Sequence, residues 1–432
     1  VPVKTDAVLK GWDPALPSPL LFPAADAEYT AEWTPLYTIT FSVDGTPANG
    51  TLKATVDGNE IHSGDKVEEG KTVTFTAVPE TGCNVKEWKV DGAVTGSTSN
   101  TYTHHVTETL NVKVSFEVGS AVLTLTPGQS TIKVMAITFD NNPITVEGCN
   151  ETSFPSNRET PLTATGTTVV LKGKIVILDC SRNNLTALNV QGLSALQGLN
   201  CSRNNLTALN VQGLSALEEL RCWENKLTSL NVQGSSKLQK LNCEANQLTA
   251  LDVQGLSKLQ DLNCGENQLK ALNVQGLSAL KELRCNKNQL TSLNVQGLSN
   301  LENLGCAFNQ LNAINVQGLN KLQELSCDAD GLTDLNVQGL SNLKVLSCVF
   351  NQLNAAAFTK LFNDLPQHTE SDGATCTLYF EGEFQGNHDG NHTDFTSPPA
   401  LKTAFQNAKN VKKWKMCKLL WENKKPKPVE IN

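Results

Sequence analysis

Apolar residues recur with a fixed period of 21 residues between Ile175 and Leu353. Cysteine marks the period most clearly, because one occupies the same place in every copy: Cys180, Cys201, Cys222, Cys243, Cys264, Cys285, Cys306, Cys327 and Cys348. A fixed period in the twenties is typical of a solenoid, in which each repeat forms one coil and stacks on the next. We therefore expect residues 175–353 to form one stacked domain.

Within one repeat, apolar and polar positions alternate over two short runs. In the clearest copy, residues 199–201 (Leu-Asn-Cys) alternate between inward and outward side chains, which predicts a short strand. The second run, Leu206–Val211, is too short and too alternating for a helix, and Gln212-Gly213 ends it. Both sides of each coil should therefore be extended and thin, with no regular helix on the convex side.

An asparagine follows the repeat cysteine by three residues in eight copies: Asn183, Asn204, Asn225, Asn246, Asn267, Asn288, Asn309 and Asn351. A buried turn needs partners for its N–H and C=O groups. Because an amide side chain offers two donors and an acceptor, we expect each asparagine to bridge neighbouring coils. Asp330 takes this place in the remaining copy, where it keeps the acceptor and loses the donors.

The repeat LxxLxCxxNxLxxLxVxxLxx resembles the leucine-rich repeats, and more closely the short bacterial class with a nested half-repeat. This resemblance covers residues 175–353 and implies a parallel sheet along one face of the coil. Free cysteine behaves as a small buried hydrophobe. Stacked coils would hold neighbouring cysteines about 4.8 Å apart, which exceeds the usual Cβ separation of a disulfide, and a single column lacks the tetrahedral grouping of a zinc site. We therefore expect free, buried thiols.

Strand-like runs separated by Asp-Gly turns fill residues 36–117. Ser63-Gly64-Asp65, and Trp88 followed by Gly92, resemble the divergent B repeats of internalin-type bacterial surface proteins. The resemblance implies a small antiparallel β domain over this segment.

Residues 1–35 contain Gly-Trp-Asp-Pro at 11–14 and an alternating run at 29–33, which resemble the back half of a further B repeat. We interpret residues 1–35 as a partial B-repeat-like fragment, whose front half would lie upstream of Val1. The alternative is a disordered proline-rich leader, which the two tryptophans of this segment argue against.

A solenoid needs caps, because its first and last coils would otherwise expose an apolar interior. We interpret the strand-rich residues 118–174 as the N-terminal β cap. Residues 354–432 predict a helix–strand–helix–strand closure that resembles the C-terminal caps of the same repeat family, and whether Cys376 and Cys417 pair stays open. The expected fold is thus mainly β: a leucine-rich-repeat solenoid with a parallel sheet, preceded by small antiparallel β domains and followed by an α/β cap.

Charge and motif content exclude several classes of function. The net charge of −8 disfavours nonspecific nucleic-acid binding, and the lack of a long apolar run predicts no transmembrane segment. His388 and His392 have the spacing of a helical zinc site, but the glycine and asparagine around them disfavour a helix. We interpret this stretch as a solvated cap loop, and we expect no metal, no cofactor and no catalytic residue.

The resemblances imply an adhesin-like, non-enzymatic bacterial protein that is secreted and exposed at the cell surface, where B repeats would space the solenoid from the cell. Its partner would be a protein or glycan on host or neighbouring cells. Two alternatives are a purely structural stalk and a metal-dependent enzyme that uses the loop around His388 and His392.

Side chains vary among the repeats mainly at positions that flank the inward leucine and cysteine, on the expected concave face. The convex positions repeat almost unchanged, as Thr-Ala or Thr-Ser and as Val-Gln-Gly. Variation on one face fits a recognition surface, and aromatic residues beside arginine are typical of binding hot spots. The predicted ligand-binding residues are Arg221, Trp223, Glu224, Arg284, Lys287, Phe308 and Asp328.

Overall fold

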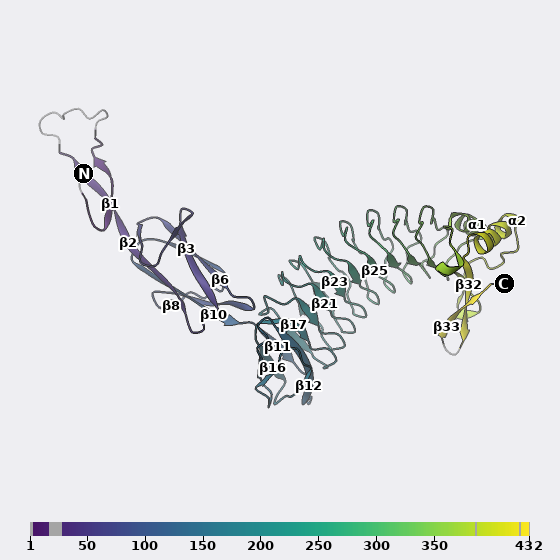
Figure 1. Cartoon of the computed structure of the whole chain (residues 1–432), viewed down its shortest axis with the longest axis horizontal. Coiled ribbons are helices and arrows are strands. Elements are labelled where there is room, and N and C mark those ends of the chain that lie inside the picture. The colour runs from purple at the N-terminus through teal and green to yellow at the C-terminus, as the bar shows by residue number, and fades with distance from the viewer. Residues whose placement is uncertain (1–2, 17–27, 385–386, 423–424, 432) are drawn as a thin grey trace. The chain divides into compact units, whose positions relative to one another are not determined.

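The computed structural model describes residues 3–16, 28–384, 387–422 and 425–431 (Figure 1). The chain divides into two compact units, Val1–Gly119 and Ser120–Asn432, and each is considered by itself. The described residues are mainly β, and their helices follow the last repeat. None of these helices is long and apolar enough to cross a membrane.

The first unit consists of two β sheets that share one core. The larger sheet contains β1 (Ala7–Asp13), β2 (Thr30–Asp44), β5 (Lys66–Glu68), β7 (Cys83–Val90), β8 (Ala93–Val94) and β10 (Leu110–Val118). The smaller sheet contains β3 (Gly50–Val56), β4 (Asn59–Ile61), β6 (Thr72–Pro79) and β9 (Thr101–His105). Phe75 from one sheet and Trp88 from the other are fully buried in the same cluster.

Strand β2 runs without a break across residue 35, where the sequence analysis placed a domain boundary. Its first half pairs antiparallel with β1, so that Trp33 lies opposite Leu9. Its second half pairs parallel with β10, so that Ile39 lies opposite Leu110. The described parts of residues 1–35 therefore form paired strands, while the proline-rich stretch 17–27 lies outside the described residues.

Six strands close the N-terminal end of the solenoid: β11 (Ser120–Thr124), β12 (Thr131–Thr138), β13 (Ile144–Glu147), β14 (Ser153–Phe154), β15 (Thr160–Thr163) and β16 (Thr168–Lys172). Strand β12 pairs with β17 (Ile175–Asp179) on one side of the first coil, and β11 pairs with β18 (Ala187–Asn189) on the other. Leu123 and Ile132 of these strands belong to the core of the solenoid, so the first coil is covered.

Each repeat contributes one short strand to a sheet of 14 strands, which lies along the inner side of the arc in Figure 1. The strands after β17 are β19 (Gly198–Asn200), β21 (Glu219–Arg221), β23 (Lys240–Asn242), β24 (Asp261–Asn263), β25 (Glu282–Arg284), β26 (Asn303–Gly305), β27 (Glu324–Ser326) and β28 (Val345–Ser347). They pair parallel and in register, with Leu199 beside Leu220, so equivalent positions form columns. We call the exposed side of this sheet the concave face.

The opposite side of the coils is extended, as the alternating pattern predicts. It contains β18, β20 (Leu209–Asn210) and β22 (Leu230–Asn231), and no helix occurs between residues 175 and 353. The constant Gln-Gly pair has a structural role here. The side chain of Gln275 donates to Asn294 O of the next coil at 2.9 Å, while Gly276 has a φ of +83° that favours glycine.

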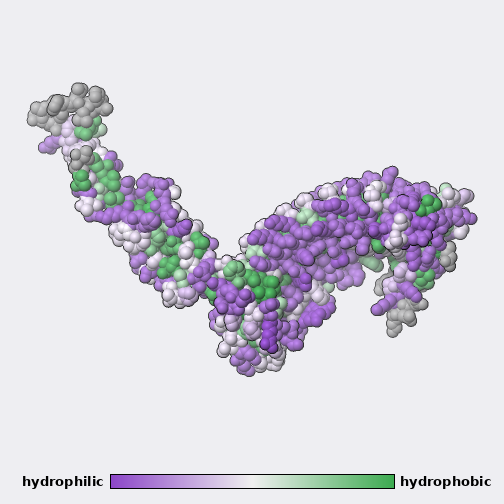
Figure 2. Space-filling model, in the orientation of Figure 1, coloured by the Kyte–Doolittle hydropathy of each residue, from purple (hydrophilic) through white to green (hydrophobic). Residues whose placement is uncertain are grey.

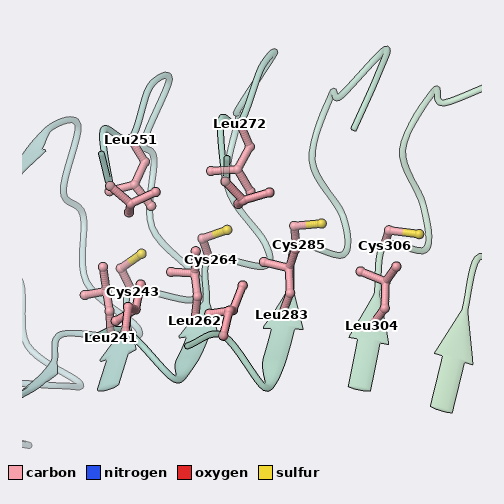
Figure 3. Close-up of a cluster of buried hydrophobic side chains, with 14 of the residues drawn as sticks. Leu241, Cys243, Leu251, Leu262, Cys264, Leu272, Leu283, Cys285, Leu304 and Cys306 are labelled. Atoms are coloured by element: carbon pink, nitrogen blue, oxygen red, sulfur yellow. The ribbon is translucent and has the colours of Figure 1, made fainter. Parts of the chain in front are cut away.

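Columns of leucine and cysteine fill the interior of the coils (Figure 3). Cys243 and Cys264 stand in one row above the sheet, and Leu251 and Leu272 face them from the other side. All nine repeat cysteines are fully buried free thiols, as expected. Burial raises the pKa of these thiols, to about 12 for Cys201.

Brief treatment of the native protein with a maleimide should modify Cys149 and leave the repeat cysteines intact. All thirteen cysteines lie in the described residues, and Cys149 alone among them is partly exposed. Because the accessible thiolate is the reactive form, a buried thiol with a raised pKa should not react. Mass spectrometry measures the modified sites, and urea-unfolded protein is the control in which all thirteen should react. Native labelling of several repeat cysteines would contradict the burial.

The repeated asparagine bridges neighbouring coils, as its donors and acceptor predict. In one coil, Asn225 Nδ2 donates to Cys201 O at 3.1 Å and to Cys222 O at 3.0 Å, and its Oδ1 accepts from Leu206 N at 3.1 Å. At the N-terminal end, Asn183 Nδ2 donates to Lys133 O of the cap at 2.7 Å. We call this column the asparagine ladder: Asn183, Asn204, Asn225, Asn246, Asn267, Asn288, Asn309, Asp330, Asn351 and Asn391.

The last member of the ladder comes from the C-terminal cap. Asn391 Nδ2 donates to Cys348 O and to Leu378 O, both at 2.8 Å, and its Oδ1 accepts from Leu353 N at 2.9 Å. The sequence analysis interpreted this stretch as a solvated loop. For Asn391 that interpretation is wrong, because its side chain is buried against the last coil.

Asp330 interrupts the ladder. Its Oδ1 accepts from Asn309 N at 2.9 Å, while its buried Oδ2 has no hydrogen-bond partner among the described residues. In the other coils an amide nitrogen at this place donates to carbonyl oxygens, so an ionised Asp330 would place a negative oxygen among carbonyl oxygens that need a donor.

The C-terminal cap contains α1 (Ala355–Asp364), η1 (Glu370–Asp372), β29 (Thr375–Phe380), β30 (Glu383–Phe384), β31 (Asn387–His388), α2 (Pro399–Gln406), η2 (Asn407–Val411), β32 (Lys415–Glu422) and β33 (Lys425–Glu430). The predicted helix–strand–helix–strand order is present as α1, β29, α2 and β32, and β29 extends the 14-stranded sheet by pairing parallel with β28. Asn354 caps α1 by accepting from Ala357 N at 3.0 Å. Cys376 and Cys417 are both buried free thiols.

The Lys/Pro segment at the C-terminus forms the edge strand β33 of the 14-stranded sheet. Ile431 N donates to Met416 O at 2.8 Å, so the odd-numbered residues of this segment turn their backbone groups toward β32. Pro426 and Pro428 therefore occupy positions whose backbone faces away from the sheet, where their missing N–H breaks no strand pairing.

Strand β15 forms the opposite edge of the same sheet and follows the same rule. Ala164 N donates to Ser130 O at 2.9 Å, so Pro161 and Thr163 turn their backbone outward. Proline lacks an N–H group, and the N–H of Thr163 donates to Glu151 Oε2 at 2.7 Å. Both outward positions of β15 are thereby without a free donor.

Candidate functional site

In every coil, the residue before the asparagine ladder has a left-handed backbone conformation, with φ between 50° and 59°. This conformation costs a residue with a side chain about 1 kcal/mol, a cost that glycine avoids. None of the nine residues is glycine or asparagine, and the charged ones are all exposed. The chain therefore keeps outward side chains where the turn alone would favour glycine. We call this row the left-handed column: Arg182, Arg203, Glu224, Ala245, Glu266, Lys287, Phe308, Ala329 and Phe350.

Ion pairs join neighbouring coils along the left-handed column. Arg203 approaches Glu224 through two contacts, Nε to Oε2 at 3.0 Å and Nη2 to Oε1 at 3.3 Å. Lys287 Nζ lies 2.5 Å from Glu266 Oε1. Because exposed ion pairs add little to stability, their main effect is to fix where these side chains stand.

Trp223 stands beside this pair on the concave face. The guanidinium carbon of Arg203 lies 4.5 Å from the centre of its indole ring, a cation–π contact. Arg203 thus touches Trp223 and Glu224 together, so two of the predicted binding residues belong to one cluster. The indole is half-buried and lines the hollows on both sides of it.

Arg221 and Arg284 point from the sheet into one shallow hollow of about 470 Å³, which Trp223 also lines. Each arginine is paired with the glutamate two residues earlier on its own strand: Arg221 Nη2 lies 2.6 Å from Glu219 Oε1, and Arg284 contacts Glu282. The structure therefore brings three predicted binding residues together, with charges of both signs around them.

Phe308 and Asp328 differ from the other predicted residues. Phe308 has a left-handed backbone, and 43% of its surface is exposed, which is unusual for a phenylalanine. Asp328 is committed to internal contacts: its carboxylate accepts from Ser347 Oγ at 2.6 Å, Val349 N at 2.9 Å and Ser326 Oγ at 3.1 Å. Burial raises the pKa of Asp328, and its contacts with Ser347 and Val349 join its coil to the next one.

A larger hollow of about 760 Å³ lies at the N-terminal end of the concave face. The cap and the first three coils line it together: Lys133, Met135, Glu159, Asp179, Ser181, Arg182, Asn200, Ser202, Arg203 and Trp223. Sequence reasoning identified only Trp223 among these residues. A signal was present in the chain, since Arg182 and Arg203 occupy one column in the two coils that precede the coil of Trp223.

The histidines of the C-terminal cap do not converge on one point. His388 Nδ1 lies 3.3 Å from Gly382 O, and His392 Nε2 lies 2.6 Å from Asp394 O. Among the described residues, no group of three His, Cys, Asp or Glu side chains could hold a metal ion.

The 21-residue coils, the parallel sheet and the ladders of cysteine and asparagine define a leucine-rich-repeat solenoid, and the segment before it is similar to a known domain family. Residues 45–120 match the family model of the divergent InlB B-repeat domain, as the Ser-Gly-Asp and Trp motifs predicted. No curated protein matches the chain.

Several solved structures resemble parts of the chain. One is described as the functional domain of InlJ from Listeria monocytogenes, which includes a cysteine ladder; it is 30% identical with a TM-score of 0.43, and the match covers 50% of this chain and 52% of that one. YopM from Yersinia pestis, a leucine-rich effector protein, is 23% identical with a TM-score of 0.39, and the match covers 47% and 54%. YopM from Yersinia enterocolitica is 24% identical with a TM-score of 0.33, and the match covers 38% and 39%. The chain thus spans about half or less of these relatives.

Proposed function

We propose that this chain is a non-enzymatic, adhesin-like bacterial surface protein that binds a protein or glycan partner on host or neighbouring cells. The concave face and the left-handed column form the binding surface. The observation that carries this proposal is the one-sided variation of the coils. The convex side repeats Gln, which links coils, and Gly, which adopts a positive φ, whereas the concave side varies in charge, size and aromatic content from coil to coil at equivalent backbone positions.

The left-handed column adds an energetic argument. Glycine would relieve the backbone at nine positions, yet arginine, glutamate, lysine or phenylalanine occurs at seven of them and alanine at the other two. Retained outward side chains at strained positions favour a role in recognition over a role in folding. Figure 2 shows a mainly hydrophilic surface over the coils. A partner would therefore make mostly polar and charged contacts there, with Trp223 and Phe308 as aromatic anchors.

The test compares two tryptophan variants of the full chain. Labelled protein is added to fixed mammalian epithelial cells and to neighbouring bacterial cells, and bound fluorescence is titrated. Trp223→Ala should weaken binding at least tenfold, because truncation of a central aromatic anchor typically costs about 2 kcal/mol. Trp421→Ala, which removes a half-exposed tryptophan from the C-terminal hairpin, should leave binding within about twofold, as expected of a residue outside the interface.

Two results would overturn the proposal. Equal binding by both variants, with unchanged circular dichroism, would move the site away from Trp223. Saturable binding to no cell type would favour the alternative of a structural stalk.

A further inference from the structure

The hollow at the N-terminal end of the concave face has a volume of about 760 Å³, within the ordinary range of small-ligand pockets. It is built by two parts of the second unit: the cap supplies Lys133 and Met135 from strand β12 and Glu159 from the segment before β15, and the first three coils supply the remaining wall. In the described part of the sheet, β17 is the coil strand that pairs with β12 of this cap, so the repeat pattern does not generate this wall in later coils.

Ser202 gives an independent sign of a ligand site. It lines the hollow and is only 1% exposed, and its hydroxyl oxygen has no hydrogen-bond partner among the described residues. Buried hydroxyl groups almost always have a partner. A polar group bound in the hollow would supply it.

Two cations of the hollow are available to a ligand. Neither the ammonium of Lys133 nor the guanidinium of Arg182 forms an ion pair within the described parts of the chain, and both side chains are exposed. Arg203 is held by Glu224 and Trp223 instead. An arginine and a lysine that line the same hollow favour the binding of a ligand with one carboxylate, because arginine can bind a carboxylate through two hydrogen bonds.

The two carboxylates of the hollow limit the charge of the ligand. Asp179 is partly used, since its oxygens accept from Ser181 N and Asn200 Nδ2, both at 2.9 Å. The side chain of Glu159 forms no hydrogen bond or ion pair among the described residues and remains an acceptor. A multiply charged phosphate would be repelled by both groups, whereas hydroxyl groups would be attracted as donors.

The remaining wall is apolar. Trp223 and Met135 present ring and thioether surface to the hollow. A ligand that combines one carboxylate, several hydroxyl groups and an apolar ring face matches this set of side chains, and these are the features of an acidic pyranose.

We propose that this hollow binds a carboxylate-bearing sugar at the end of a glycan. The carboxylate of the sugar lies between Arg182 and Lys133. The hydroxyl groups of the sugar contact Ser202 and Glu159, and the sugar ring packs beside Trp223. This inference rests on the proposed function, because it names the chemistry that one end of the concave face recognises on the partner.

The direct test titrates the full chain with sialyllactose and with lactose by isothermal calorimetry and saturation-transfer NMR. Sialyllactose should bind with a Kd on the order of 1 mM or tighter, and lactose at least tenfold more weakly. Arg182→Gln should weaken sialyllactose binding about tenfold, as expected for the loss of a charge-assisted bond, and Ser202→Ala should weaken it several-fold. Arg158→Gln, an exposed cap arginine outside the hollow, is the matched control and should bind as the parent does.

Equal affinity for the two sugars, or equal effects of Arg182→Gln and Arg158→Gln, would overturn the assignment. A short Glu-rich peptide forms the third arm. If the peptide binds through Arg182 and sialyllactose does not, the hollow takes protein carboxylates and the sugar assignment is wrong. Circular dichroism of each variant excludes misfolding as the cause.

Sialidase treatment separates this inference from the proposed function. Binding of the parent chain to treated cells should fall to the level of Arg182→Gln on untreated cells. If cell binding persists after sialidase while Trp223→Ala still abolishes it, the acidic-sugar site fails and the proposed function stands. If the chain binds no cells but binds sialyllactose through Arg182, the sugar site stands and the proposed function fails.

Discussion

Asp330→Asn is expected to raise the free energy of unfolding at pH 8 by about 3 kcal/mol. The buried Oδ2 of Asp330 lacks a partner among the described residues, where the other members of the asparagine ladder place a donor. Burial raises the pKa of Asp330 to about 7, and the negative charge of Asp328 adds to the effect. Asparagine would restore the donor and remove the charge.

The same variant should flatten the pH dependence of stability. The folded chain keeps the proton of Asp330 up to about pH 7, whereas the unfolded chain loses it near pH 4. Because the folded state then binds more protons, stability should fall as the pH rises from about 4 to about 7 and stay low above that range. The titratable groups that face Asp330 are Asp328 and the thiols of Cys285, Cys306 and Cys327.

Urea unfolding followed by circular dichroism at pH 5 and pH 8 measures both effects. Asp252→Asn is the matched control, because Asp252 also replaces an asparagine of the repeat but lies exposed on the convex side. It should change the free energy of unfolding by less than about 0.5 kcal/mol. The same pH dependence in the parent and in Asp330→Asn would show that Asp330 is ionised in the folded chain.

Asn267→Ala is expected to lower the free energy of unfolding by about 4 kcal/mol, because several buried backbone groups lose their partner. Asn267 Nδ2 donates to Cys243 O at 3.0 Å, Cys264 O at 3.1 Å and Gly265 O at 3.0 Å. Its Oδ1 accepts from Leu248 N at 3.0 Å. Alanine can satisfy none of these groups, and Asn267 is buried, with 8% of its surface exposed.

Asn273→Ala in the same coil is the control for Asn267→Ala. Asn273 is exposed on the convex side, where its Oδ1 accepts from Gln275 N at 3.1 Å. Water can replace that contact, so the loss should stay below about 1 kcal/mol. The measurement is again urea unfolding at neutral pH, and similar losses for the two variants would contradict the structural role of the ladder.

The repeat made the solenoid predictable from sequence. A 21-residue period places Leu, Cys and Asn in columns, and each column has one physical explanation: apolar burial for Leu199 and Cys201, and backbone hydrogen bonding for Asn204. Short alternating runs also predicted the absence of convex helices. These features arise from contacts between equivalent residues of neighbouring coils. One copy of the repeat, together with its period, therefore predicts them.

Features that join different parts of the chain were not predictable in this way. Asn391 enters the ladder from a cap loop whose distance from Asn351 breaks the period. The hollow beside Trp223 depends on which cap residues reach the coils, and Lys133 has no mark in the sequence that distinguishes it from other strand lysines. Asp328 looked like an outward acid of a variable column, but the serines of its own and the next coil enclose it.

The prolines in the two edge strands of the 14-stranded sheet affect whether another chain can add a strand to it. An open sheet edge is a template on which another chain can add a strand and start a fibre. Pro161 at one edge and Pro426 and Pro428 at the other withhold donors at outward positions, and Glu151 occupies the donor of Thr163. A second chain is therefore expected to gain few backbone hydrogen bonds by adding a strand at either edge of this sheet.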